Sequence, residues 1–224
     1  MKKKNVFFYF DFISPYAYLS LRPLKKVIQE TNSNLILVPV LFAGFLKENE
    51  TKGPAEIPSK RIFIFKDITR IGLKQNISIK GPPVHPFNPL LPLRVISSIK
   101  NEEMKWKATL KLFDACWRDG IDISDEKNID QLLKEIQLNS IEIFENLIDA
   151  RELLKLQTEQ SIKDGIFGVP SFRVENEVFW GQDRIEFLKE FLEGKDPFCE
   201  EKYQKKLKNI LDRPTKHRKI KSKM

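Results

Sequence analysis

Residues 5–17 read NVFFYFDFISPYA, and this stretch decides the fold. Its first half is rich in aromatic and β-branched residues and is only long enough for a strand, so residues 5–11 are predicted to form a buried β-strand. Ser14 and Pro15 then begin a helix, because serine is a preferred N-cap and proline is favoured at the first helical position. The turn from strand to helix therefore places a helix N-terminus, a favourable position for ligand binding, at Ser14.

The next segment extends this opening to β-α-β. Apolar residues continue at helical spacing up to the polar run at residues 32–34, and Pro23 inside that pattern predicts a kink or a restart of the helix. Residues 35–41 (LILVPVL) form a second apolar run of strand length. Pro39 within it favours an edge or strand-end position.

The middle of the chain changes character at about residue 42. Helical patterns with charged faces cover residues 106–117 and 129–158, while Gly-Pro-Pro at 81–83 and several later prolines interrupt the region. The chain up to about residue 165 is therefore predicted to be a helical insertion.

Strand patterns return near the end of the chain. Residues 171–175 and 177–180 are predicted as two short strands joined by a tight turn at Asn176. A last helix follows, and Asp183 with Glu186 three residues later fits a capping box at its start. The predicted order, β-α-β, helices, β-β-α, is that of an α/β thioredoxin-like fold with a large helical insertion.

The predicted domain organisation follows from this order. Residues 1–41 and 166–198 form a discontinuous thioredoxin-like domain, residues 42–165 a helical insertion domain, and residues 199–224 a flexible basic tail. The formal net charge is +8, and all of this excess lies in residues 201–224, where ten Lys and Arg accompany two Asp and Glu. A neutral body with a basic tail is not typical of a nucleic-acid-binding domain. The tail is interpreted as a solvated, frayed end, with weak binding to an anionic surface as the alternative.

Other classes of protein are excluded by composition. The two cysteines, Cys116 and Cys199, are far apart, so neither a disulfide framework nor a metal site is expected, and Cys116 is assigned to the apolar core. The first apolar run is far shorter than the ~20 residues of a membrane span. Residues 2–4 are lysines that imitate the start of a secretory signal, but Asp11 interrupts the apolar run behind them. We interpret this run as the first strand of a cytoplasmic enzyme.

The start of the first helix is the predicted catalytic position. Disulfide-exchanging proteins of this topology place a reactive cysteine there, because the helix dipole and free amides lower the pKa of a thiol. Here the position reads Ser14-Pro15-Tyr16-Ala17, and both cysteine positions are occupied by residues that cannot form a disulfide. The Ser14 hydroxyl can still stabilise the thiolate of a ligand, because a hydroxyl accepts from a backbone N–H and donates its own proton at the same time. His85 and His217 lack the partners of a catalytic triad or a metal site.

A second element lies directly before the third predicted strand, at Val169 and Pro170. In thioredoxin-like proteins a proline here follows a cis peptide bond, and the preceding residue presents its backbone to a bound thiol or peptide. We therefore expect the bond between Val169 and Pro170 to be cis.

Several strings of sequence carry a resemblance to a known family. They are FYFDFISPY at 8–16, PSKR at 58–61, WRDGIDIS at 117–124, GVPS at 168–171 and FWGQDR at 179–184. On these strings the chain resembles the 2-hydroxychromene-2-carboxylate isomerase family, which is related to the kappa-class glutathione transferases. The resemblance extends over about residues 5–192.

The resemblance implies that glutathione binds across the start of the first helix. The Ser14 hydroxyl would be directed at the glutathione sulfur, with Pro15 and Tyr16 beside it. The backbone of Val169, next to Pro170, would pair with the tripeptide.

Further contacts are implied by the same resemblance. The γ-glutamyl end of glutathione would be lined by Trp180, Gly181, Gln182, Asp183 and Arg184, with Asp183 taking the α-amino group. Lys60 would meet the glycyl carboxylate, and Thr51 stands where relatives have an asparagine. Asn88 and Lys47 are the implied substrate contacts, and a homodimer is the implied assembly.

The implied activity is a glutathione-dependent isomerisation of an aromatic keto acid. The thiolate adds to a conjugated bond, the substrate rotates about the resulting single bond, and elimination returns glutathione. One alternative is a kappa-class-like transferase that releases the adduct from an electrophilic substrate. Another is a non-catalytic protein that binds thiols or peptides beside Val169. A disulfide oxidoreductase is the least favoured, because it would have to use Cys116 or Cys199.

Overall fold

A four-stranded sheet is the centre of the computed structural model, which describes residues 3–214. Its strands are β1 (Asn5–Phe10), β2 (Asn34–Pro39), β3 (Ser171–Val174) and β4 (Glu177–Trp180). The strand order is β2-β1-β3-β4, with β1 and β2 parallel and the other pairs antiparallel. The predicted thioredoxin-like topology is thereby confirmed, and Pro39 lies at the end of an edge strand as expected.

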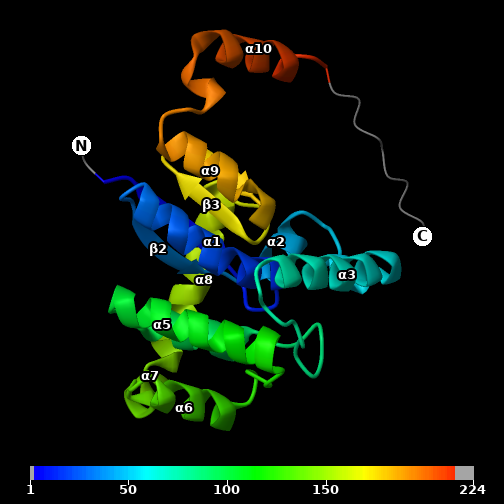
Figure 1. Cartoon of the computed structure of the whole chain (residues 1–224). Coiled ribbons are helices and arrows are strands. Elements are labelled where there is room, and N and C mark those ends of the chain that lie inside the picture. The colour runs from blue at the N-terminus through cyan, green and yellow to red at the C-terminus, as the bar shows by residue number, and fades with distance from the viewer. Residues whose placement is uncertain (1–2, 215–224) are drawn as a thin grey trace.

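Helices surround this sheet and make up most of the chain (Figure 1). They are α1 (Pro15–Glu30), α2 (Phe42–Glu48), α3 (Pro58–Lys74), α4 (Leu90–Ser98), α5 (Glu102–Phe113), α6 (Glu126–Glu135), α7 (Ser140–Glu145), α8 (Leu147–Lys163), α9 (Ile185–Leu192) and α10 (Glu201–Leu211). α1 packs against α3, α5 and α9, while α4, α5 and α8 contact β2. In Figure 1 the insertion helices α5, α6 and α7 lie below the sheet and α10 lies above it. Within the described residues, no helix is both long and apolar enough to cross a bilayer.

Aromatic rings join the sheet to the insertion. Phe8 stacks on Phe10 and on Phe172, with ring centroids 5.2 and 5.3 Å apart. Phe12 continues this row and meets Phe113 of α5 at 4.5 Å. All of these side chains are fully buried, so each contributes on the order of 3 kcal/mol or more to stability. The core therefore runs without a break from the sheet into the helices.

A buried carboxylate fastens α1 to the end of α5. α5 continues into a π-helical turn at Asp114–Asp119, and the Asp114 side chain accepts hydrogen bonds from the Tyr18 hydroxyl at 2.8 Å and from Arg22 Nη2 at 2.7 Å. Arg118 adds a third contact at 3.2 Å. The carboxylate is paired and hydrogen-bonded, as a buried charge must be.

One of the two alternatives at Pro23 is wrong, and so is the cap expected at Asp183. α1 runs through Pro23 without a restart, and a kink at this proline, which has no N–H for the helix ladder, stays a prediction. Asp183 does not cap α9, because residues 182–184 form a separate 3₁₀ turn and α9 begins after Arg184 with no side-chain cap. The helical pattern at 129–158 is also divided, into α6, α7 and α8, by short breaks.

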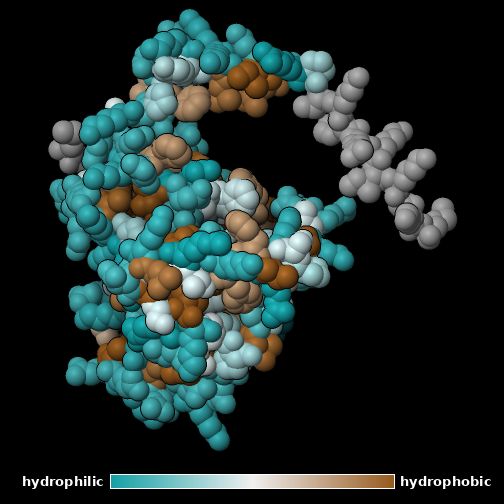
Figure 2. All heavy atoms as spheres, turned by 45° about the vertical axis from the view of Figure 1, so that its right-hand side comes forward, coloured by the Kyte–Doolittle hydropathy of each residue, from teal (hydrophilic) through white to brown (hydrophobic). Residues whose placement is uncertain are grey.

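The C-terminal region contains a helix that the sequence analysis did not predict. α10 has no buried residue, and its Leu207, Ile210 and Leu211 are 40, 47 and 70% exposed. Figure 2 shows apolar atoms on the side of α10 that faces the rest of the chain. The division into domains at residues 41 and 166 and the flexibility of the tail stay predictions, and residues 215–224, including His217, lie outside the described part.

We expect Asp114→Ala to lower the free energy of unfolding by about 2–4 kcal/mol, because it leaves the Tyr18 and Arg22 donors without their buried acceptor. Asp119→Ala, which removes an exposed pair with Arg118, is the matched control and should cost less than about 1 kcal/mol. Urea denaturation measures both. Equal losses for the two variants would contradict the role assigned to Asp114.

Candidate functional site

Ser14 caps α1 as the sequence predicts. Its backbone is extended, with φ −93° and ψ 111°, and its Oγ accepts a hydrogen bond from the Ala17 N–H at 3.2 Å. The same oxygen lies 3.5 Å from the Val169 carbonyl, toward which its proton can be donated. The side chain is buried, with 8% of its residue surface exposed. The hydroxyl therefore has one stable acceptor role and one long, weak donor contact that a better acceptor can replace.

A cleft of about 130 Å³ opens onto Ser14. Its walls come from the β1–α1 loop, α2, the segment before α3, α3 itself, and the loops around residues 85 and 169. They are formed by Ile13, Ser14, Pro15, Tyr16, Phe42, Leu46, Gly53, Pro54, Ala55, Glu56, Ile64, His85, Pro86 and Val169. Most of these side chains are apolar, so a charged sulfur here would depend on the few polar groups at the helix start.

The helix start supplies those polar groups. Pro15 has no N–H, and the Tyr16 amide is one of the first helical amides, which have no acceptor within the helix. Together with the Ser14 hydroxyl and the positive end of the helix dipole, this amide favours a negative charge at the mouth of the cleft. The arrangement suits a thiolate from a ligand.

The loop before β3 forms the opposite side of this site. The peptide bond between Val169 and Pro170 is cis, as expected. The Gly181 N–H donates to the Pro170 carbonyl at 2.9 Å, which holds the start of the 180–184 segment beside the loop. A Cβ at Gly168 would lie 2.7 Å from Trp180 Nε1, so a larger residue here would displace the indole. The loop and the Trp180 indole are therefore in direct contact.

His85 is a wall of the cleft that the sequence analysis did not place there. Its Nε2 lies 3.0 Å from the Ile13 carbonyl, so this nitrogen carries a proton and donates. The ring packs edge-on against Trp117 and Phe65. Burial lowers the pKa of His85, which favours the neutral imidazole. We conclude that His85 positions the loop that leads to Ser14.

Asp11 is a second residue that contacts the Ser14 loop and for which the sequence predicted no such role. It is fully buried, and its carboxylate accepts from the Ile13 N–H at 3.0 Å and from the Phe42 N–H at 2.8 Å. One side chain thus connects the Ser14 loop to the first residue of α2. Burial raises the pKa of Asp11 to about 7, although both hydrogen bonds oppose the shift.

The comparisons with known proteins agree with this geometry. The DSBA-like thioredoxin domain family matches residues 5–193 of the chain. The chain belongs to this family. In this DSBA-like thioredoxin domain, the start of α1 at residues 14–17 (SPYA) contains no cysteine.

Individual relatives and a solved structure show which enzymes the chain resembles. Glutathione S-transferase kappa 1 of Caenorhabditis elegans is 22% identical, with 92% of this chain and 99% of that protein covered. The 2-hydroxychromene-2-carboxylate isomerase of Sphingobium xenophagum is 24% identical, with 84% of this chain and 98% of that protein covered. A solved structure of 2-hydroxychromene-2-carboxylate isomerase superposes with a TM-score of 0.78 at 21% identity, over 93% of this chain and all of that one. The resemblance to these two groups of enzymes is confirmed.

The structure gathers some of the predicted site residues around one cleft. Ser14, Pro15, Tyr16 and Val169 line it, and Pro170 is tied by its carbonyl to Gly181. The chain continues from Gly181 into the 3₁₀ turn at residues 182–184, which packs against α1. The Tyr16 hydroxyl donates to Asp67 of α3 at 2.9 Å, so the phenol is held by α3.

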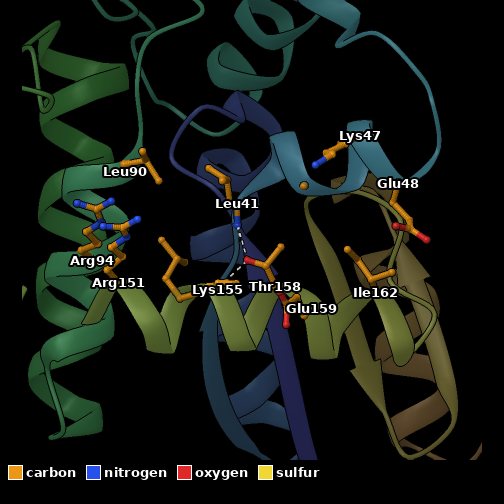
Figure 3. Close-up of a pocket in the computed structure, with 12 residues that line it drawn as sticks. Leu41, Lys47, Glu48, Leu90, Arg94, Arg151, Lys155, Thr158, Glu159 and Ile162 are labelled. Atoms are coloured by element: carbon orange, nitrogen blue, oxygen red, sulfur yellow. Dashed lines mark hydrogen bonds between the residues drawn. The ribbon is translucent and has the colours of Figure 1, made fainter. Parts of the chain in front are cut away.

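Other predicted residues lie elsewhere. Thr51 and Lys60 are exposed and are not among the residues that line the Ser14 cleft. Asn88 accepts from the Leu90 N–H at 3.1 Å at the start of α4. Lys47 lines a different cavity, on the other side of α2 (Figure 3). Their assignment to glutathione or substrate stays a prediction.

We expect Asp11→Asn to flatten the pH dependence of stability between about pH 4 and 7. Because the native pKa is raised, the folded state binds the proton more tightly than the unfolded chain does, so the contribution of Asp11 to stability is full below about pH 4 and is lost as the pH rises toward 7. The wild type should thus lose up to a few kcal/mol relative to the variant over this range, at about 1.4 kcal/mol per pKa unit. Urea denaturation at several pH values measures the slope, and parallel slopes would contradict the assignment.

Proposed function

We propose that this protein is a glutathione-dependent isomerase of an aromatic keto acid, with Ser14 stabilising the glutathione thiolate. The observation that carries the proposal is the Ser14 hydroxyl, which caps α1 and has a proton available at the mouth of an apolar cleft. The kappa-class transferases and 2-hydroxychromene-2-carboxylate isomerases among the relatives support glutathione as the thiol.

The physical task of the site is to ionise a thiol at neutral pH. A free thiol with a pKa near 8.5 is only about 3% thiolate at pH 7, and each unit by which the pKa falls stabilises the anion by about 1.4 kcal/mol. A hydroxyl hydrogen bond and the α1 N-terminus together suffice for about one or two units. When the thiolate enters, the Ser14 proton turns from the distant Val169 carbonyl to the sulfur.

The remaining steps need orientation more than further charge. The thiolate adds to a conjugated bond of the substrate, and a proton neutralises the resulting carbanion. Rotation about the new single bond and loss of the same proton and thiolate then give the isomer and free glutathione. No net oxidation occurs, and glutathione is a nucleophilic catalyst that the apolar cleft shields from water.

The glutathione chain is proposed to extend from Ser14 along the loop before β3. Val169 offers its backbone to the tripeptide, and the 180–184 segment borders the γ-glutamyl end, with Asp183 exposed and able to meet an ammonium group. A homodimer is part of the proposal, on the resemblance to these enzymes alone.

We expect Ser14→Ala to lower kcat/KM for the glutathione-dependent reaction by about tenfold to a hundredfold and to raise the pKa of bound glutathione, because one hydrogen bond to the thiolate is lost. Ser14→Gly separates catalysis from capping, since glycine at an N-cap costs only a few tenths of a kcal/mol. It should lose as much activity as the alanine variant. Ser20→Ala, which removes a buried hydroxyl of the same helix bonded to the Tyr16 carbonyl, is the control. Full turnover by both Ser14 variants would overturn the proposed role.

The fate of the thiol distinguishes the isomerase from a kappa-class-like transferase. With glutathione at a concentration below that of the substrate, an isomerase converts all of the substrate and leaves the free thiol unchanged. A transferase stops when the thiol is consumed. Thiol titration beside product chromatography gives the answer, and stoichiometric loss of thiol would replace the isomerase proposal with the transferase. If calorimetry shows no glutathione binding, the remaining alternative is a non-catalytic protein that binds other thiols or peptides.

A further inference from the structure

A second cavity, of about 500 Å³, lies on the other side of α2 from the Ser14 cleft. Phe42 and Leu46 of α2 line the Ser14 cleft, whereas Gly44, Lys47 and Glu48 line the second cavity. Its other walls are the end of the β2–α2 connection, α4 and α8 (Figure 3). The volume is typical of a site for a small organic molecule.

The floor of this cavity is aliphatic. Leu41, Leu90, Leu154 and Ile162 line it and no aromatic ring does. Thr158, the hydroxyl residue of the wall, already uses its Oγ to accept from the Leu41 N–H at 3.0 Å and to donate to the Leu154 carbonyl at 2.8 Å. The polar contacts left for a ligand are therefore those of the charged side chains at the rim.

Positive charge is concentrated at one end of the cavity. Arg94 of α4 and Arg151 of α8 point their guanidinium groups to the same end, while Glu48 lies at the opposite end (Figure 3). Lys47 and Lys155 add two more cations, and Glu159 is the second anion of the lining. Among residues 3–214, none of the four cations forms a salt bridge.

Part of the Arg94 guanidinium group is desolvated. Its Nε is shielded from solvent and has no hydrogen-bond partner among the described residues. A partly desolvated guanidinium attracts an anion more strongly than one in water. Two like charges at one end of a cavity, neither of them in a salt bridge within residues 3–214, favour an anion that contacts both.

We propose that this cavity binds an organic anion with an aliphatic body, whose carboxylate or phosphate head lies between Arg94 and Arg151. The planar guanidinium groups match either head through paired hydrogen bonds, and the leucines and Ile162 cover the aliphatic part. The site is separate from Ser14 and does not depend on glutathione.

Octanoate and octyl phosphate are the probes, and octanol is the neutral control. Calorimetry on the full chain should show binding of at least one of the two anions and none of octanol. Arg94→Gln/Arg151→Gln should weaken anion binding by at least about tenfold, since one charge-assisted hydrogen bond is enough for a tenfold change in the dissociation constant. Lys100→Gln/Lys163→Gln removes two exposed charges near the ends of α4 and α8 and should change it by less than about twofold.

Arg151→Glu is a second test of the site, which is needed if the double variant does not fold. Its side chain is exposed, so the fold should be kept, as thermal unfolding will check, while the reversed charge should abolish anion binding. Equal binding of octanol, or anion affinity that survives both variants, overturns the proposal. A change in oligomeric state on Arg151→Glu, seen by sedimentation in a chain that binds neither probe, would also overturn it, because a second copy would then be the occupant.

Discussion

The hydrogen bond from the Ala17 N–H to Ser14 Oγ is the contact on which the proposed chemistry rests. It ends the loop after β1 and starts α1 at Pro15, and because Ser14 Oγ is the acceptor in it, the serine proton is left available for donation. In a disulfide-exchanging protein of this fold the same helix end lowers the pKa of the protein's own cysteine. Ser14 carries no thiol, so under the proposed function this helix end would act on the thiol of bound glutathione instead.

The loop that carries Ser14 is held from three sides by distant parts of the chain. The Trp117 indole donates to the Phe12 carbonyl at 2.9 Å, His85 donates to the Ile13 carbonyl, and the Phe42 N–H donates to Asp11. All three partners come from the helical region between β2 and β3. That region therefore does more than cover the sheet, because it fixes the backbone of the loop that carries Ser14. Preorganisation of this kind reduces the reorganisation needed when a charged sulfur binds.

The sequence predicts those features whose cause is local. Strand β1 and the cap at Ser14 depend on residues adjacent in the chain, and both are present. The cis bond before Pro170 was expected from the place of this proline in the thioredoxin-like order of elements, and it is also present. The roles of Asp11 and His85 depend on partners 31 and 72 residues away, so no local pattern announces them. The expected capping box at Asp183 fails because a 3₁₀ turn takes up the residues before α9.

Lys47 was predicted to contact the substrate, but its side chain lines the second cavity and not the Ser14 cleft. Each step along a helix turns the side chain by about 100°. Leu46 therefore faces the Ser14 cleft while Lys47, one residue later, lines the second cavity. The short helix α2 is thus a wall with an apolar cleft on one side and an excess of positive charge on the other. The Phe42 N–H at the start of this helix is bound to the buried Asp11 carboxylate, so α2 is held in place by the end of β1 that leads into the Ser14 loop.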